Sequence, residues 1–569
     1  MTFPRQWLPR SIECLRGYTA RQFSQDFVAG LTVGLVALPL AMAFAIASGV
    51  PPQAGIYTAV VAGFLISALG GSRTQIGGPT GAFIVIVAAI VVKFGIPGLA
   101  LVGIMAGLLL LIMGLTGLGS AVKYIPRPVT IGFTNGIALL IASTQIKDFL
   151  GLTTPSVPSD FLSRIELLAH HLTTARPETI AVGLASLAII LCLPYLTRRI
   201  PGAIVALVLL TAVSAAFHLH LETIGTKFGG IPRGLPHIAL PNFRGVHVLT
   251  LLPSAFTVAM LAAVESLLSA VVADGMSGDH HDSNMELIAQ GIANIISPMF
   301  GGMPATGAVA RTATNIRSGA HTPVAGIVHA ATLLLILLFA APLASYVPLT
   351  TLAAVLFVVA YNMGEWREIA TIFHLSKTDI AVWFTTFSLT VFADLTVAVG
   401  VGMSLAALLY IYRVAATTTV APVTHEYLVD GQAHILQDKE IPVNVTILRI
   451  HGPFLFGTTE KLAEATRDLN QLGGIVILRL RNMTALDATG VHAFEQFNTR
   501  LHKTGRTLLL CGARDQPCHI IDHSDFLKHV GPENVLPNVQ AALTRARELQ
   551  GNFEGLAPEL TRELATQPI

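Results

Sequence analysis

Long apolar stretches separated by short polar turns run from residue 27 to residue 413, and this pattern predicts a series of membrane helices. A helix needs roughly 20 apolar residues to cross the hydrocarbon layer of a bilayer. The pattern predicts fourteen segments, grouped as seven plus seven: 27–47, 53–70, 79–93, 97–117, 128–148, 178–197, 201–218, 254–274, 284–300, 307–317, 322–341, 347–363, 378–393 and 395–413. We therefore expect an α-helical polytopic membrane protein.

The third and tenth segments are too short to cross a membrane, and each includes or follows a run of small residues. The first run reads Gly-Gly-Pro-Thr-Gly-Ala over residues 77–82, and the second reads Met-Pro-Ala-Thr-Gly-Ala over residues 303–308. Thr32 matches Thr257 at nearly the same offset as Thr80 matches Thr306, which suggests a duplicated unit with repeats at about 27–245 and 250–413. Each short segment is therefore predicted to be a half-helix that starts inside the membrane, beside a transporter's binding site.

The pattern changes after Arg413, where the apolar stretches become short. Residues 414–440 are predicted to form a polar linker, and residues 551–569 a C-terminal tail. Between them, residues 441–550 predict a small α/β domain. Its strands are expected near 443–450, 474–480 and 506–511, and its helices near 459–472, 490–503 and 539–549.

Composition supports a membrane protein, because charged residues make up 12% of the chain against roughly 25% in soluble domains. Hydrophobic residues make up 53%, and the mean hydropathy is +0.66. The net charge of +2 gives no reason to expect a nucleic-acid partner. The four cysteines are too scattered for a zinc site or a disulfide framework. We expect no metal or cofactor, and no phosphate-binding loop or nucleophile constellation indicates an enzyme.

The distribution of Lys and Arg predicts the orientation of the chain. Residues 1–26 hold four arginines without an apolar stretch, so they predict a cytoplasmic segment and no cleavable signal peptide. With both termini expected in the cytoplasm, the predicted cytoplasmic side holds Arg73, Lys123, Arg127, Arg198, Arg199, Arg317, Arg367, Lys377 and Arg413.

Several stretches together resemble the SulP (SLC26) anion transporter family. Residues 29–39 read Ala-Gly-Leu-Thr-Val-Gly-Leu-Val-Ala-Leu-Pro, and residues 300–320 read Phe-Gly-Gly-Met-Pro-Ala-Thr-Gly-Ala-Val-Ala-Arg-Thr-Ala-Thr-Asn-Ile-Arg-Ser-Gly-Ala. Residues 486–491, Leu-Asp-Ala-Thr-Gly-Val, are similar to a motif of the STAS domain. The resemblance implies a seven-plus-seven inverted repeat, a core bundle that moves against a gate bundle, and usually a homodimer. Within the family the chain looks nearest to bacterial members that include a C4-dicarboxylate carrier.

The central hypothesis is an anion held between two helix N-termini, which leave backbone N–H groups unpaired and carry partial positive charge. This hypothesis assigns the anion site to Thr80, Gly81 and Ala82 from one half-helix and to Ala308, Val309 and Ala310 from the other. Alternatively, these small residues only allow close helix packing.

The resemblance adds two residues to the anion site. In the family, an arginine at the position of Arg311 contributes positive potential, and the first helix presents an aromatic edge at Phe44. The alternatives are a structural salt bridge between Arg311 and Glu265, and a Phe44 ring that serves only the core.

Glu265 is the only acidic residue well inside a predicted span. Low dielectric favours the uncharged form of a carboxyl group, so this residue is predicted to carry a co-transported proton. Some relatives use an aspartate in this region for sodium, and a packing role for the glutamate is the other alternative. In the STAS-like segment, Thr489 matches a position that is phosphorylated in bacterial anti-sigma antagonists; the alternative is a helix-capping role.

These observations predict a secondary active transporter in the lipid bilayer that takes up a small anion with protons. The candidate substrates are sulfate, bicarbonate and C4-dicarboxylates. The competing hypotheses are a passive anion channel, a sodium-coupled bicarbonate transporter, and a membrane-tethered signalling protein whose STAS domain contacts a cytosolic protein.

Overall fold

The computed structural model of the protein describes residues 8–564, except for 120–125, 156, 159, 198–200, 233, 235–237, 239–247, 375, 394 and 423–440. Three of the predicted cytoplasmic residues, Lys123, Arg198 and Arg199, lie outside the described residues. The chain forms two compact units, Met1–Ala406 and Ala407–Ile569.

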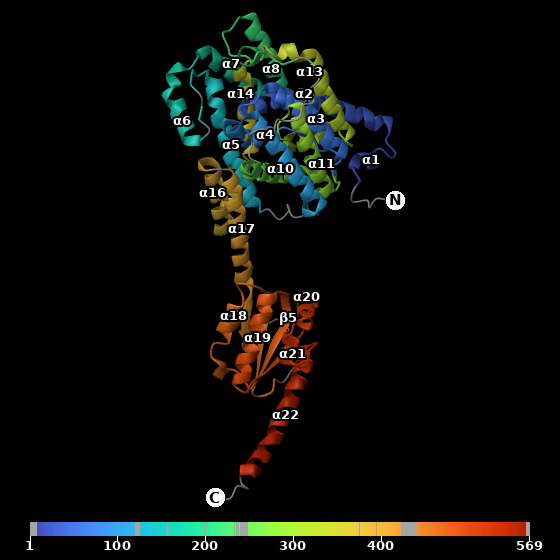
Figure 1. The fold of residues 1–569 in the computed structure, drawn as a ribbon, viewed down its shortest axis with the longest axis vertical. Helices are drawn as coiled ribbons and strands as arrows, with labels where there is room; N and C mark the ends of the chain where they lie inside the picture. The colour runs from blue at the N-terminus through green and yellow to red at the C-terminus, as the bar shows by residue number, and fades with distance from the viewer. Residues whose placement is uncertain are drawn as a thin grey trace. The chain divides into compact units, whose positions relative to one another are not determined.

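In its described residues, the first unit consists of helices and two very short strands joined by loops (Figure 1). Its elements are α1 (Arg10–Cys14), α2 (Ala20–Ala47), α3 (Pro52–Leu69), β1 (Gly77–Gly78), α4 (Phe83–Leu115), α5 (Arg127–Leu150), α6 (Phe161–His170), α7 (Pro177–Leu196), α8 (Gly202–Ala216), α9 (Ile224–Phe228), α10 (Val248–Ser277), α11 (Ser283–Ile296), β2 (Thr306–Gly307), α12 (Val309–Arg317), α13 (Val324–Ala344), α14 (Leu349–Met363), α15 (Trp366–His374), α16 (Lys377–Phe392) and α17 (Leu395–Thr417).

Helices coincide with the segments that the hydrophobic pattern predicts. Among the described residues, nine helices are long and apolar enough to cross a membrane, and the count of fourteen spans stays a prediction. Helix α4 changes direction at Gly95, whose φ of 70° and ψ of −178° are not helical. Pro97 follows and lacks a backbone N–H, so the break separates the predicted third and fourth segments. Helix α12 has nine residues, which span roughly 14 Å and cannot cross about 30 Å of hydrocarbon.

The helices of the first unit pack as two groups. Helices α2, α3, α4, α10, α11, α12 and α13 form one group, in which α11 packs on α4 and α13 packs on α2 and α3. Helices α5, α7, α14 and α16 form the other, with α14 and α16 packed on α5. The two groups meet where α14 contacts α2. The broken segments lie in the first group.

Small residues bring helix axes together in the first group. A β carbon at Gly291 in α11 would lie 2.7 Å from the carbonyl oxygen of Gly107 in α4. The converse distance, from a β carbon at Gly107 to the oxygen of Gly291, is 2.6 Å. Backbones this close pack without side chains between them, which is a common arrangement in membrane helices.

The second unit is an α/β domain with one five-stranded sheet in the order β3-β4-β5-β6-β7. Its elements are β3 (Thr419–Pro422), β4 (Val445–Phe454), α18 (Glu460–Ala465), β5 (Ile475–Leu486), α19 (Ala488–Lys503), β6 (Thr507–Cys511), α20 (Asp515–Asp522), α21 (Phe526–Val530), β7 (Val535–Leu536) and α22 (Val539–Leu564). β3 pairs antiparallel with β4, and the other neighbours pair parallel. Successive residues of β5 are buried against α19 on one face and α22 on the other, as in a central strand.

The structure differs from the sequence-based expectation at three places in this unit. The helix expected over 459–472 ends at Ala465, where the Thr466 hydroxyl donates to the Leu462 carbonyl. The predicted linker starts inside α17 and contains β3, while residues 423–440 lie outside the described residues. The predicted tail begins within α22, which continues to Leu564.

We expect Gly291→Ala to lower the free energy of unfolding by about 1–3 kcal/mol, because the new methyl group overlaps the Gly107 carbonyl. Unfolding of the purified protein in detergent measures this change. Gly275→Ala in α10 is the matched control, since a β carbon there has no neighbour within 4 Å. An equal loss in both variants would contradict the close-approach explanation.

Candidate functional site

The two broken segments meet at a short antiparallel pairing of β1 with β2. Gly77 lies opposite Gly307, and Gly78 lies opposite Thr306. The backbone N–H of Ala308 extends the pairing by donating to the Ile76 carbonyl at 2.8 Å. The extended backbone before each helix is thus paired within the protein, as the interior of a bilayer requires. The two similar motifs, residues 77–82 and 303–308, thus lie together, each in non-helical backbone directly before its helix, α4 or α12.

Polar side chains of α12 complete this pairing. Thr312 accepts a hydrogen bond from the Ile76 N–H at 3.0 Å, and Asn315 donates to the Thr74 carbonyl at 2.8 Å. Both residues are fully buried. The sequence reasoning did not single them out, although uncharged polar residues inside a predicted membrane helix were a usable signal.

The first turn of α4 leaves backbone donors free. The N–H of Phe83 donates to the Thr80 carbonyl at 3.3 Å, and that of Ile84 donates to the Gly81 carbonyl at 3.1 Å. The N–H groups of Gly81 and Ala82 make no hydrogen bond to the described residues. These are orphan donors of the kind found at helix starts.

The first turn of α12 is similar. Thr312 is the first residue whose N–H is bonded within this turn, to the Ala308 carbonyl at 2.9 Å. The N–H groups of Val309, Ala310 and Arg311 have no partner among the described residues, and no side chain caps the helix. Ala308 is buried, Val309 is half-buried and Ala310 is exposed. Both half-helices therefore present unpaired donors and the positive end of a helix dipole.

Arg311 connects the two broken segments. Its side chain is buried, and its Nη2 donates to the carbonyl oxygen of Pro79 in the other segment. Its Nη1 has no hydrogen-bond partner among the described residues. The φ of Gly78 is 143°, a conformation that favours glycine, and a β carbon at this position would lie 2.7 Å from this Nη1.

The two matching threonines contact neighbouring turns of α10, but their partners differ. Thr80 donates to the carboxylate of Glu265 at 2.8 Å, and Thr306 donates to the carbonyl of Ala262 at 2.9 Å. Glu265 is partly buried. No ion pair within 4.0 Å joins Glu265 to Arg311 in the described part of the chain, so the alternative of a salt bridge is not realised in this conformation.

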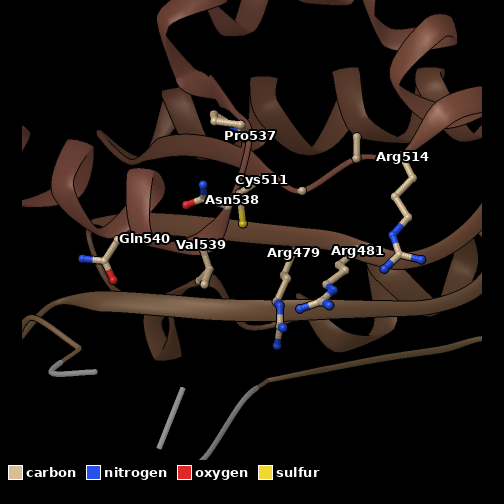
Figure 2. A pocket seen from close by; sticks show the side chains of 10 residues that line it. Arg479, Arg481, Cys511, Arg514, Pro537, Asn538, Val539 and Gln540 are labelled. Carbon is tan, nitrogen blue, oxygen red and sulfur yellow. The ribbon is translucent and has the colours of Figure 1, made fainter. Parts of the chain in front are cut away.

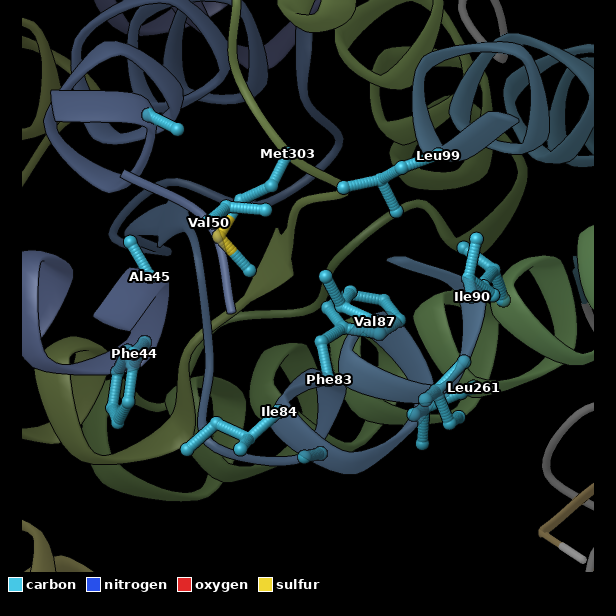
Figure 3. Close-up of a cluster of buried hydrophobic side chains, with 14 of the residues drawn as sticks. Phe44, Ala45, Val50, Phe83, Ile84, Val87, Ile90, Leu99, Leu261 and Met303 are labelled. Carbon is cyan, nitrogen blue, oxygen red and sulfur yellow. The ribbon is translucent and has the colours of Figure 1, made fainter. Parts of the chain in front are cut away.

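Phe44, in the last turn of α2, lies beside Gly81, which precedes α4. A β carbon at Gly81 would lie 3.5 Å from Cε1 of Phe44, 3.4 Å from Cδ1 of Ile141 and 3.5 Å from the sulfur of Met363. Ile141 and Met363 belong to α5 and α14 of the second group. Figure 3 shows Phe44 as part of the buried apolar cluster that includes Phe83 and Ile84. Apolar side chains therefore cover Gly81 on its side toward the second helix group.

Thr489 is exposed in the first turn of α19. The helix cap is Asp487, whose carboxylate accepts the Gly490 N–H at 2.8 Å. The same carboxylate also accepts the Phe456 N–H at 3.0 Å. The capping role considered for Thr489 thus belongs to Asp487, and the Thr489 side chain is accessible.

The α/β unit also holds a cavity of about 520 Å³ that the sequence reasoning did not predict (Figure 2). Arg479, Arg481 and Arg514 line it, together with Cys511 and the start of α22. Burial lowers the pKa of the Arg479 guanidinium, and the charges of Arg481 and Arg449 lower it further. Burial raises the pKa of the Cys511 thiol to about 11, so this thiol is neutral at physiological pH.

Comparison with known proteins assigns both units. Residues 23–386 match the family model of the sulfate permease family, and residues 437–542 match that of the STAS domain. The chain is 39% identical over 521 residues to the "Putative sulfate transporter YvdB" of Bacillus subtilis, covering 91% of this chain and 97% of that protein. It is 31% identical to the bicarbonate transporter BicA of Picosynechococcus, covering 95% and 97% of the two chains.

A solved structure shows the same fold. The murine Slc26a9 anion transporter in its inward-facing state superimposes with a TM-score of 0.84, covering 95% of this chain and 94% of that chain. The sequence identity is 19%, so this likeness concerns the fold alone.

We expect Thr312→Val to lower the free energy of unfolding by about 1–3 kcal/mol, because it leaves the buried Ile76 N–H without its acceptor. Thr314→Val is the matched control in the same helix, since the Thr314 hydroxyl bonds the Ala310 carbonyl one turn back. Chemical denaturation in detergent measures both variants. Equal effects at the two positions would show that the Thr312 contact across the broken segments is unimportant.

Proposed function

The chain belongs to the sulfate permease family and carries a STAS domain, and from this premise we propose that it is a secondary active transporter for proton-coupled uptake of small anions. The candidate substrates are sulfate, bicarbonate and C4-dicarboxylates. Two relatives are named as sulfate and bicarbonate transporters, which supports the first two. A site made of backbone donors selects by charge and size, so all three remain in the proposal.

The observation that carries this proposal is the set of unpaired N–H groups at the starts of α4 and α12. In this proposal the anion accepts hydrogen bonds from Gly81 and Ala82 on one side and from Val309 and Ala310 on the other. Two helix dipoles and the buried guanidinium of Arg311 supply positive potential in a region of low dielectric. No lysine is needed, and small side chains let the ligand reach the backbone.

Closure of this site would come from the second helix group. Ile141 and Met363, like Phe44, lie within 3.5 Å of the β-carbon position of Gly81. Separation of the two groups would remove these apolar side chains from Gly81 and open the site to water. In this mechanism the first group carries the anion and the second group acts as the gate.

Proton coupling would act through Glu265. The carboxylate is hydrogen-bonded to the Thr80 hydroxyl, just before the start of α4. When the carboxylate is ionised, its negative charge therefore repels an incoming anion. Protonation removes this charge, so an anion and a proton are bound together. The Thr80 hydroxyl links the two events because it contacts Glu265 and begins the anion-binding turn.

The remaining parts of the proposal concern the setting of the transporter. We place this multi-pass membrane protein in the inner membrane with both termini in the cytoplasm, as a homodimer. The accessible Thr489 would be a phosphorylation site that adds close to two negative charges at the start of α19. Such a change would alter the contact of the STAS domain with a cytosolic protein.

A transport assay in proteoliposomes tests the proposed function. We expect labelled sulfate, bicarbonate, fumarate or succinate to accumulate above equilibrium when the outside is more acidic than the inside. Dissipating the proton gradient should stop this accumulation. Uptake that only equilibrates the anion would indicate a passive channel, and uptake driven by a sodium gradient alone would indicate sodium coupling.

We expect Glu265→Gln to remove the pH dependence of uptake, because a neutral amide imitates the protonated carboxyl group at every pH. Wild-type uptake should fall as the external pH rises from about 6 to about 8, since fewer carboxyl groups are protonated. The variant's rate should change less than about twofold over this range. Glu286→Gln is the control, because Glu286 is buried in α11 and bonded to the Gly71 N–H. A variant with the wild-type pH profile would rule out proton coupling through Glu265.

A further inference from the structure

His329 in α13 is buried without a hydrogen-bond partner. Its side chain is 0% exposed, and neither ring nitrogen has a partner among the described residues. A neutral imidazole has one N–H donor and one acceptor nitrogen, and burying both without partners is unfavourable. Native interiors avoid such a cost, so an unpaired buried group indicates a partner such as ordered water.

The ring of His329 lies against glycine. A β carbon at Gly63 in α3 would lie 3.6 Å from its Cε1 and 3.7 Å from its Nδ1. The same point is 3.1 Å from the carbonyl oxygen of Gly77 in β1. The imidazole is therefore adjacent to the pairing that joins the two broken segments.

Arg311 approaches the same face of α3. Its unpaired Nη1 is 2.7 Å from the β-carbon position of Gly78, which is itself 3.4 Å from the Cα of Ala59. Ala59 and Gly63 are four residues apart, which is about 6 Å along a helix axis. Because residues four apart lie on one face of a helix, the unpaired Nη1 and the imidazole are both next to neighbouring turns of α3.

A third unpaired polar group lies one turn further along α3. Ser67 is buried and its Oγ has no partner among the described residues. A β carbon at Gly326, three positions before His329 in α13, would lie 2.0 Å from this Oγ. The three unpaired groups thus follow one another along the packing of α3 against α13 and β1.

We propose that an internal water molecule joins His329 to Arg311 and that His329 is a positioning residue for this guanidinium. Nη1 of Arg311 donates to the water, and the water donates to the unprotonated ring nitrogen. With the Pro79 carbonyl as the other anchor, the guanidinium is then held at two points. This inference rests on the proposed function, because Arg311 is the charged group of the proposed anion site.

Removing the imidazole tests the inference by its effect on affinity. We expect His329→Leu to raise the KM of anion uptake about tenfold with little change in maximal rate, because the guanidinium loses one anchor. His329→Gln retains a donor and an acceptor and should restore most of the affinity. Thr332→Val is the matched control one turn along α13, since the Thr332 hydroxyl bonds the Val328 carbonyl at 2.8 Å. Its KM should equal that of the wild type.

Two further variants separate a positioning role from a packing role. In an Arg311→Ala background, His329→Leu should change the KM no further, because residues that act through one contact are not additive. Gly63→Ala should raise the KM while His329 is intact, since its methyl group occupies the space beside the ring. A His329→Leu variant with the KM of the wild type would overturn the inference, as would an equal increase in both backgrounds.

A structure of the full-length wild-type protein, at a resolution that shows ordered water, tests the bridge without any transport assay. Density between the imidazole and Nη1 of Arg311 would support the inference, and an empty position would overturn it. Failure of the proposed function would appear differently, as no saturable uptake of any tested anion by the wild type.

Discussion

The structure depends on one constraint: a backbone that leaves its helix inside the membrane must pair its N–H and C=O groups within the protein. Two segments of this chain, directly before α4 and α12, are non-helical. Each interruption supplies the partner for the other, through the β1–β2 pairing and the bond from Ala308 to Ile76. Thr312 and Asn315 then satisfy the groups that the two-residue strands do not reach. Among the described residues, the backbone donors that stay free beside this pairing are those of the first turns of α4 and α12, as at any helix start.

The similarity of the two motifs in sequence does not extend to their contacts. Thr80 bonds a carboxylate that can bind a proton, whereas Thr306 bonds the backbone carbonyl of Ala262. In the proposed mechanism the first motif therefore couples the proton to the anion, whereas the Thr306 contact of the second motif only anchors β2 to α10. Arg311 adds a second difference between the motifs. It follows the second motif, and its guanidinium donates a hydrogen bond to the Pro79 carbonyl in the first. A duplicated scaffold has thus become asymmetric at the few side chains that carry charge.

The STAS domain has a core of its own, because β5 is buried on both faces by α19 and α22. Side chains alternate between the two faces of β5, so Arg479 lies on the same face as Ile475 and Ile477, the face that α22 covers. Arg479 lines the basic cavity on this face. A continuous apolar strand was visible in the sequence. The cavity was not, because it requires arginines of two chain segments to meet beside the start of α22.

The sequence by itself determined the elements of this protein. Hydrophobic length defines the helices, glycine and proline define the breaks, and alternating short segments define the α/β domain; all of these are local properties. It also placed Thr80, Gly81 and Ala82 at a helix start, because small residues precede an apolar stretch there. Only the tertiary structure decided which groups these residues contact. Thr80 meets Glu265 185 positions away, and no pattern identified His329 as a neighbour of Gly63. Such partners depend on how distant helices pack, and local periodicity carries no information about that packing.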